Sequence, residues 1–345
     1  MRAVVYAGPG QVRIDDVAIP AVQHPHGAVV KVALTGICGT DLHVIRGHMS
    51  GVEPGTVLGH EFVGTITDVG DAVHRLAVGD RVMSSDFTAC GECEPCRRGQ
   101  HWHCAERAFF GTGASFGPRL AGAQAEYVYV PHAETTLAKA RCTDDAAILI
   151  GDNLATAWIA IQRARLQPGE IVAVIGGGAV GQLTALIAQV AAAGPVIVIE
   201  PNNERRAFAM TQGCVPAAPA DAGEVTRALS NGAGADVVVD AVGGNALLDS
   251  ALDLCRKGGR VVSVGVHASE TWSMPVARCF NHELSLSFAI GDSMAVRDEL
   301  VRMVNGGTFD PTIVIDRHVE FNDIPASYGS LTRQECMKVV ARVSR

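Results

Sequence analysis

The sequence predicts an α/β protein that combines a doubly wound parallel sheet with a second, β-rich domain. From Pro168 onward, apolar runs of strand length alternate with helical segments, the order that builds a parallel sheet covered by helices. The first third instead has short β-rich runs between Gly-, Pro- and His-bearing turns. The length of 345 residues also favours two domains, because single cores usually stop growing at roughly 250 to 300 residues.

The composition is that of a globular protein that acts on small molecules. Hydrophobic residues make up 48% of the chain, charged residues 19%, and the net charge is -8. This charge gives no electrostatic reason to bind nucleic acid or an anionic membrane. The longest apolar region, 183–199, is interrupted by Gln189 and by Gly194-Pro195, so no membrane span is expected. Ten cysteines without a secretory signal predict a reducing, cytoplasmic location.

In the first domain, strands are expected at 28–34 and 62–69, and a four-cysteine lobe follows them at 90–104. The lobe has the spacing C-x2-C-x2-C-x7-C, which can close around one tetrahedral Zn²⁺ and leaves no open position for chemistry. We therefore predict a structural zinc. The alternatives are a disulfide cluster, which such close neighbours form poorly, and a nucleic-acid zinc ribbon, whose two knuckles would lie roughly 15 to 20 residues apart. The four predicted ligands are Cys90, Cys93, Cys96 and Cys104.

The second domain begins with a strand at 171–175, a glycine turn, a helix at 180–193 and a strand at 196–200. The turn satisfies G-x-G-x-x-G, where glycines let the backbone and the helix N-terminus approach a pyrophosphate. Its residues are Gly176, Gly177, Gly178, Ala179, Val180 and Gly181. A glycine turn that serves packing alone is the alternative.

Glu200 ends the second strand, 19 residues after Gly181, where an acidic side chain accepts hydrogen bonds from the adenosine ribose. Its carboxylate would repel a 2′-phosphate, so the sequence favours NAD over NADP. Arg205 could reach the ribose or the phosphate from the following turn, or be a solvated helix cation.

The alternation continues with a strand at 236–241, a helix at 246–256, a strand at 260–264 and an apolar stretch at 284–290. A helical segment at 294–305 and mixed short elements follow. We expect this tail to return to the first domain.

Two further motifs contain residues that bind metals: GICGTDLH at 36–43 and GHE at 59–61. Spacing alone cannot join them. Together with the lobe and VIGGGAVG at 174–181, however, they follow the order seen in the zinc-containing medium-chain alcohol dehydrogenases, and the resemblance runs over essentially the whole chain. It implies a GroES-like catalytic domain at 1–153 and 293–345, a Rossmann domain at 154–292, and a substrate cleft between them.

The resemblance implies that Cys38, His60 and Asp152 are the ligands of a catalytic zinc. Relatives of the horse-liver type carry cysteine at the third position, whereas some bacterial secondary-alcohol dehydrogenases resemble this chain in using aspartate. One thiolate, one carboxylate and one neutral imidazole leave the Zn²⁺ site near neutral, as two thiolates and an imidazole would. Asp152 could instead be a helix N-cap. Glu61 is interpreted as an outer group of the zinc site, a transient fourth ligand or a buried structural carboxylate.

The same resemblance implies roles for four other residues. Thr40 looks like the hydroxyl that relays a proton from the substrate, and His43 would pass it to solvent. As alternatives, Thr40 could bond to backbone in a turn, and His43 could be a surface histidine. Thr156 should lie near the nicotinamide, and Lys338 near the pyrophosphate. Asp41 is expected to be structural, fixing this loop or the relay.

We therefore predict an NAD-dependent zinc alcohol dehydrogenase with one catalytic and one structural zinc per chain. It would transfer a hydride between NAD(H) and an alcohol/ketone pair, with secondary alcohols first. Polyol and threonine dehydrogenases share the scaffold and stay open, and a non-catalytic NAD-binding zinc protein is the alternative of another class. The expected partner is a further copy of the chain, in a homotetramer or a dimer joined through the apolar run at 284–290. Neither nucleic acid nor a membrane is expected.

Overall fold

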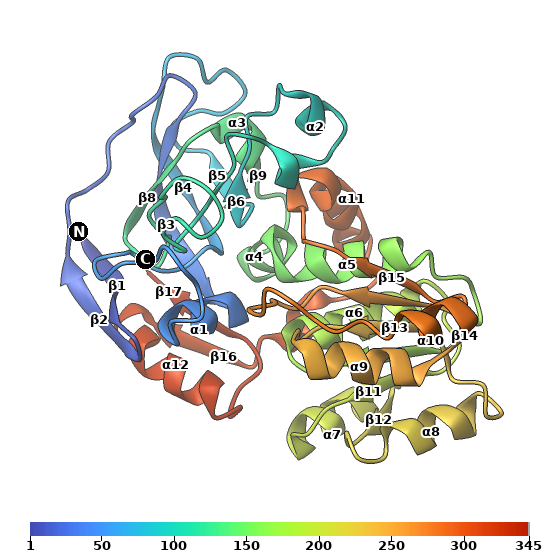
Figure 1. Cartoon of the computed structure of the whole chain (residues 1–345). Helices are drawn as coiled ribbons and strands as arrows, with labels where there is room; N and C mark the ends of the chain where they lie inside the picture. Colours follow the sequence, from blue (N-terminus) through green and yellow to red (C-terminus); the bar gives the residue numbers. More distant parts are fainter. Residues whose placement is uncertain (344–345) are drawn as a thin grey trace. The chain divides into compact units, whose positions relative to one another are not determined.

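A computed structural model describes residues 1–343 (Figure 1). The chain divides into two compact units, one made of residues 1–155 together with 292 onward and the other of residues 156–291. The domain boundaries predicted after residues 153 and 292 lie close to these positions. No helix in residues 1–343 is long and apolar enough to cross a bilayer.

The first unit is built on a seven-stranded sheet with the order β16-β17-β3-β4-β5-β9, in which β8 also pairs with β3. Strand β17 lies antiparallel to β3, with Val339 opposite Ile37, so the tail returns to the first unit as expected. The strands are β3 (Ala28–Ile37), β4 (Phe62–Val69), β5 (Arg81–Ser84), β8 (Tyr127–Val130), β9 (Leu137–Lys139), β16 (Arg317–Glu320) and β17 (Val339–Arg342).

Two hairpins accompany this sheet: β1 (Arg2–Gly8) with β2 (Gln11–Asp16), and β6 (Phe87–Thr88) with β7 (Ala108–Phe109). Most helices of the unit are short, and several of them lead into or out of the sites described below. They are α1 (Gly39–Ile45), α2 (Glu94–Arg97), η1 (His101–His103), α3 (Ala133–Thr136), α4 (Asp144–Gly151), α11 (Ser293–Asn305), η2 (Pro311–Val314), η3 (Phe321–Asp323) and α12 (Ile324–Thr332).

The core of the first unit follows the two-residue period of its strands. Ala28, Val30 and Val32 occupy alternate positions of β3 and are fully buried. Phe62 at the start of β4 meets Phe110 edge to face, with ring centroids 5.4 Å apart. This packing holds the ends of β3 and β4, from which the metal-binding motifs project.

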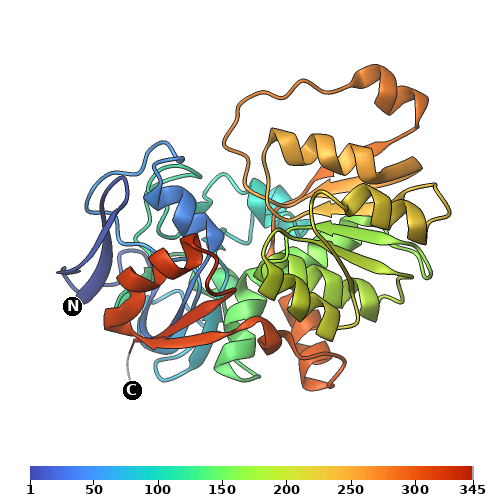
Figure 2. The same cartoon turned by 90° about the horizontal axis from the view of Figure 1, so that it is seen from below.

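The second unit is a parallel six-stranded sheet with the order β12-β11-β10-β13-β14-β15. Numbered within the unit, this is 3-2-1-4-5-6, the order of doubly wound dinucleotide-binding sheets, and it confirms the predicted fold class. Figure 2 shows helices on both faces of this sheet. The strands are β10 (Val172–Ile175), β11 (Val196–Ile199), β12 (Val215–Ala217), β13 (Ala235–Asp240), β14 (Cys255–Ser263) and β15 (Ser285–Phe288).

The central strands β10 and β11 read VAVI and VIVI, and every residue in them is buried. Such unbroken apolar runs are typical of strands covered on both faces. The helices are α5 (Asn153–Ala164), which begins in the first unit, α6 (Ala179–Val190), α7 (Asn203–Thr211), α8 (Ala222–Leu229), α9 (Asn245–Leu254) and α10 (Val276–Asn281). Several predicted boundaries differ by a few residues, and the largest difference is at β14, which begins at Cys255 rather than near 260 because an irregular pairing with β13 extends it.

Candidate functional site

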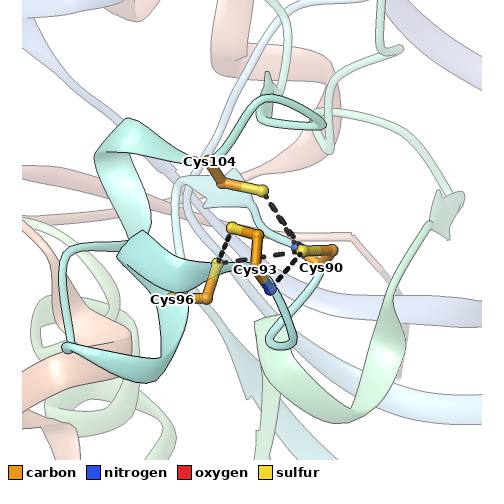
Figure 3. Close-up of side chains that lie close together, drawn as sticks. All are labelled: Cys90, Cys93, Cys96 and Cys104. Atoms are coloured by element: carbon orange, nitrogen blue, oxygen red, sulfur yellow. Dashed lines mark hydrogen bonds between the residues drawn. The ribbon is translucent and has the colours of Figure 1, made fainter.

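The hairpin β6-β7 carries the four-cysteine lobe between its strands, and Figure 3 shows the four thiols turned toward one another. The Sγ atoms of Cys93 and Cys96 are 3.4 Å apart, those of Cys90 and Cys104 3.5 Å, and those of Cys90 and Cys96 4.0 Å. Four sulfurs about 2.3 Å from one zinc ion would be separated by about 3.8 Å. The lobe therefore fits a closed four-thiolate zinc site.

The histidines inside the lobe take no part in this set. His101 instead faces Asp292, with Nδ1 3.0 Å from the carboxylate, and its backbone N–H donates to the same side chain at 2.9 Å. His103 is exposed.

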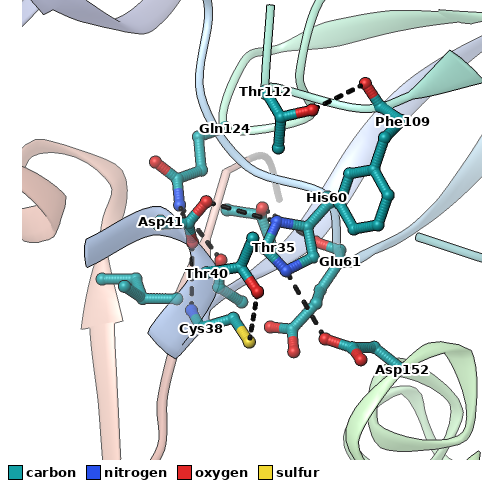
Figure 4. Close-up of polar contacts among 12 residues, drawn as sticks. Thr35, Cys38, Thr40, Asp41, His60, Glu61, Phe109, Thr112, Gln124 and Asp152 are labelled. Carbon is teal, nitrogen blue, oxygen red and sulfur yellow. Dashed lines mark hydrogen bonds and ion pairs between the residues drawn. The ribbon is translucent and has the colours of Figure 1, made fainter. Parts of the chain in front are cut away.

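A second group of metal-binding side chains lies at the end of the main sheet of the first unit (Figure 4). Cys38 follows β3, His60 and Glu61 precede β4, and Asp152 follows α4. Their ligand atoms all lie within 4.8 Å of one another. The structure thus brings together the three predicted ligands and Glu61, although spacing alone could not join them.

The donor set suits zinc, which binds thiolate, imidazole and carboxylate. His60 Nε2 lies 3.5 Å from Asp152 Oδ2, and this buried nitrogen makes no hydrogen bond with any residue in 1–343. A buried polar atom without a partner is costly, and a metal ion held between Cys38, His60 and Asp152 would satisfy it. Asp152 is also the C-cap of α4.

Asp41 orients the imidazole ligand. Its Oδ1 lies 3.2 Å from His60 Nδ1, which leaves Nε2 turned toward Asp152, and its Oδ2 accepts a hydrogen bond from the Cys38 backbone N–H at 3.0 Å. Burial lowers the pKa of His60, but the neighbouring Asp41 and Asp152 outweigh it and hold the pKa well above its ordinary value. A carboxylate behind a metal-binding histidine fixes the ring and raises its basicity. Asp41 therefore holds the loop, as expected, and also orients His60, one of the predicted metal ligands.

Glu61 and Lys338 form a buried ion pair, with Lys338 Nζ 2.5 Å from each carboxylate oxygen of Glu61. Each residue is 1% exposed. Burial raises the pKa of Glu61 to about 7, while the charge of Lys338 opposes this rise. This pair does not test the expected contact of Lys338 with the cofactor pyrophosphate, which stays a prediction. The Nζ atom of Lys338 donates to Glu61 and to the backbone carbonyl of Ile37, which is 3.4 Å away.

Helix α1 places Thr40 and His43 one turn apart, beside Cys38 at its N-cap. Thr40 Oγ1 lies 4.0 Å from Cys38 Sγ. His43 is half-buried, and burial, together with His48 and Arg46, lowers its pKa. His48 is exposed and its Nδ1 lies 3.4 Å from that of His43, so the two imidazoles lead from α1 to the surface. The proton path itself stays a prediction.

In the second unit, the glycine turn joins β10 to α6, with Gly178 as the N-cap and Ala179 and Val180 in the first turn of the helix. Gly176 has a φ of +98°, and a Cβ on Gly181 would lie 1.8 Å from the Gly176 carbonyl oxygen. Both positions therefore require glycine, and the open helix N-terminus has the form that receives a pyrophosphate.

Glu200 lies beside this turn at the carboxyl end of β11. Its Oε2 accepts a hydrogen bond from Gly177 N at 2.7 Å, and its Oε1 accepts one from Asn202 N at 2.9 Å. A carboxylate can accept about four hydrogen bonds, so capacity for ribose hydroxyls is left. The guanidinium of Arg205 also borders the turn, since a Cβ on Gly178 would lie 3.8 Å from Arg205 Nη1. These placements fit a dinucleotide site.

Thr156 is buried at the start of the second unit, where its hydroxyl packs on Gly291. The predicted contact with the nicotinamide is not tested by this packing.

Sequence reasoning missed Asn153, which supports two of the predicted metal ligands. Its Nδ2 lies 3.0 Å from Asp152 Oδ2 and 3.7 Å from Cys38 Sγ. An amide next to a ligand aspartate could have served as a signal, but only after Asp152 itself had been identified.

Comparison with known proteins agrees with this site. The alcohol dehydrogenase GroES-like domain matches residues 24–141, and the zinc-binding dehydrogenase domain matches residues 179–305. A probable zinc-binding alcohol dehydrogenase of Mycobacterium tuberculosis is 39% identical over 96% of this chain and 85% of its own length. A probable D-xylulose reductase A of Aspergillus terreus is 30% identical over 97% of this chain and 96% of its own length.

Among solved structures, the alcohol dehydrogenase TADH of Thermus sp. ATN1 superposes with a TM-score of 0.94 and 36% identity, covering 100% of both chains. These similarities agree with the fold and with the two groups of metal-binding side chains. The chain belongs to the family of zinc-containing medium-chain alcohol dehydrogenases, with a GroES-like and a Rossmann-like domain.

Proposed function

We propose that this protein is an NAD-dependent dehydrogenase of secondary alcohols that holds two zinc ions per chain. The observation that carries the proposal is the meeting of Cys38, His60 and Asp152, from three separate parts of the chain, beside His60 Nε2, which makes no hydrogen bond within residues 1–343. The four-cysteine lobe would hold the second, structural ion.

Each residue around the first site would have its own role in the reaction. A zinc ion bound there supplies Lewis acidity, which makes the substrate hydroxyl a stronger acid. Cys38, His60 and Asp152 hold that ion, and Asp41 keeps the imidazole oriented. Glu61 remains neutralised by Lys338 behind the ligands.

The proton of the substrate hydroxyl would pass to Thr40 and then to His43. Because burial lowers the pKa of His43, its imidazole is neutral near pH 7 and can accept the proton. The exposed His48, 3.4 Å away, can then exchange it with water. NAD bound at the glycine turn would supply the acceptor for the hydride that leaves the carbinol carbon, so that the alcohol becomes a ketone.

Glu200 supports NAD as the coenzyme, since a buried carboxylate beside the glycine turn would repel the 2′-phosphate of NADP. Arg205 and the first turn of α6 would bind the adenosine half.

Secondary alcohols are the first proposed substrates, since aspartate as the third ligand resembles the secondary-alcohol enzymes of this family. Polyols are the second candidate, supported by the similarity to a probable D-xylulose reductase.

The chain is also proposed to associate with copies of itself through the second unit. Strand β15 lies at the edge of its sheet, and Val276, Phe280, Phe288 and Ile290 nearby are 66%, 80%, 55% and 46% exposed. Such an apolar edge favours pairing between subunits.

The test is NADH and NADPH formation from 2-butanol, a primary alcohol, a polyol and threonine, before and after dialysis against a chelator and readdition of zinc. NAD-linked turnover of 2-butanol and the polyol, both of which carry secondary hydroxyls, above that of the primary alcohol and threonine is the expected result, and it should be lost with the metal and restored with it. Turnover that survives complete zinc removal would contradict the proposal.

A further inference from the structure

A carboxylate without a role in the proposed mechanism, Asp86, lies in the turn between β5 and β6. It is 6% exposed and is not one of the four residues whose ligand atoms converge on the metal site. A carboxylate is charged in water, and burying it costs free energy of desolvation, so the position of Asp86 needs an explanation.

The backbone around Asp86 connects it to two of the metal ligands. Two residues earlier, the carbonyl of Ser84 packs on Gly151, the residue before Asp152, so closely that a Cβ on Gly151 would lie 2.3 Å from it. The carbonyl of Asp86 accepts a hydrogen bond from Phe110 N at 3.2 Å. Asp86 is thereby held between the segment that carries Asp152 and the strand that ends beside His60.

Aromatic side chains make up the surroundings on the His60 side. Phe109 lies against His60 with ring centroids 5.3 Å apart, and Phe87, next to Asp86, stacks on Phe109 at 6.4 Å. Trp102 and Phe116 extend this cluster, with ring centroids 6.2 Å and 5.5 Å from that of Phe109. A substrate carbon chain beside the metal site would meet an apolar wall.

The carboxylate of Asp86 has few partners. Its Oδ1 accepts a hydrogen bond from Ser85 Oγ at 3.1 Å, and no cation in residues 1–343 forms an ion pair with it. Burial, with a further contribution from the charge of Asp152, raises the pKa of Asp86 well above its ordinary value, while the charge of His60 and the hydrogen bonds from Ser85 and the backbone oppose this rise. A carboxyl group has more hydrogen-bonding capacity than one serine uses, so a further hydroxyl can be bound here.

We propose that Asp86 binds a second hydroxyl of the substrate, next to the carbon that is oxidised, so that vicinal diols and polyols are the preferred secondary alcohols. Binding pockets that are mostly apolar obtain their specificity from a few placed polar groups of this kind. A site built to bind a hydroxyl also rejects the analogue that lacks it, because its own polar group is then left unpaired. This inference rests on the proposed function and narrows its substrate class.

The test compares 2,3-butanediol, as separate stereoisomers, with 2-butanol, which has the same carbon chain and one hydroxyl fewer. We expect the zinc-loaded wild-type protein to favour its best diol isomer in kcat/KM by ~100-fold or more. Asp86→Ala should lower this ratio at least ~10-fold, and Asp86→Asn, which keeps one acceptor oxygen, should fall between the two. Ser85→Ala is the matched control: it removes the neighbouring hydroxyl, keeps the carboxyl group and should change the ratio less than Asp86→Ala does.

Zinc content and thermal unfolding of each variant separate recognition from support of the fold. Equal losses for both substrates in Asp86→Ala, or loss of zinc from it, would show a structural role and overturn the inference. A wild-type protein that oxidises 2-butanol as well as every diol isomer would also overturn it, while leaving the proposed function standing. A fully zinc-loaded protein that oxidises neither would overturn the proposed function itself, and this inference with it.

Discussion

The ion pair between Glu61 and Lys338 shows how single residues support the metal site from behind. The two side chains are 277 positions apart in the chain and almost fully inaccessible. Removing one partner of such a pair leaves an uncompensated buried charge, which typically costs about 3 to 5 kcal/mol.

We therefore expect Lys338→Met to lower the free energy of unfolding by about 3 kcal/mol, at the lower end of that range, because Glu61 can take up a proton. Urea unfolding of the zinc-loaded protein measures this loss. The double variant Lys338→Met with Glu61→Gln removes both charges and should recover part of it. A double variant less stable than Lys338→Met would contradict the pairing.

Asp41 acts at the same scale through the imidazole of His60, 3.2 Å away. Loss of a carboxylate that orients a metal-binding histidine typically weakens metal binding by about 10- to 100-fold. Asp41→Ala should show this weakening at one of the two zinc sites, measured by competition with a chromophoric chelator. Asp71→Ala, at an exposed position, is the control; equal zinc affinities of the two variants would contradict this role.

The proposed metal ligands could be anticipated with the help of the family resemblance, whereas their supports could not. Cys38 and His60 stand in recognisable short motifs, but only the resemblance identified them and Asp152 as expected zinc ligands. The pairing of Lys338 with Glu61 was not foreseen, because a motif carries no information on which distant side chain fills a buried space. Asp86 lies in no recognisable sequence motif, and only its burial in the structure distinguishes it.

At the scale of elements, the β10-turn-α6 unit was the most predictable part. Its strand is apolar throughout, and Gly181 allows the helix to pack on the strand. The first unit was harder, because its strands are short and their order depends on pairings such as that of β17 with β3, far apart in sequence.

Gly181→Ala tests the packing of this unit. Its Cβ would lie 1.8 Å from the Gly176 carbonyl oxygen, so the variant should lose about 1 to 3 kcal/mol of unfolding free energy, as overpacked sites do. Gly178→Ala is the matched control for stability, since its Cβ would meet nothing nearer than Arg205 Nη1 at 3.8 Å and its φ of -75° suits alanine. Equal losses in chemical denaturation would contradict the packing argument.

At the scale of the whole molecule, the exposed apolar residues around β15 bear on assembly. Phe288 is 55% exposed at the edge of the sheet, and a charge there would be buried without a partner if two copies met. Phe288→Glu should therefore shift the protein toward monomers in sedimentation velocity. Met210→Glu alters a comparably exposed apolar residue of α7, at 61%, and should leave the assembly as it is. If both variants sediment like the wild type, β15 is not the interface.

We propose that one zinc ion serves catalysis at Cys38, His60 and Asp152 while a second stabilises the cysteine lobe. The decisive experiment is zinc counting on Cys38→Ser, together with NADH formation and the dissociation constant for NAD. We expect two zinc ions per chain in the wild type, one in the variant, no turnover by the variant and unchanged NAD binding. A variant that still oxidises the alcohol at the wild-type rate would contradict the assignment of the catalytic metal.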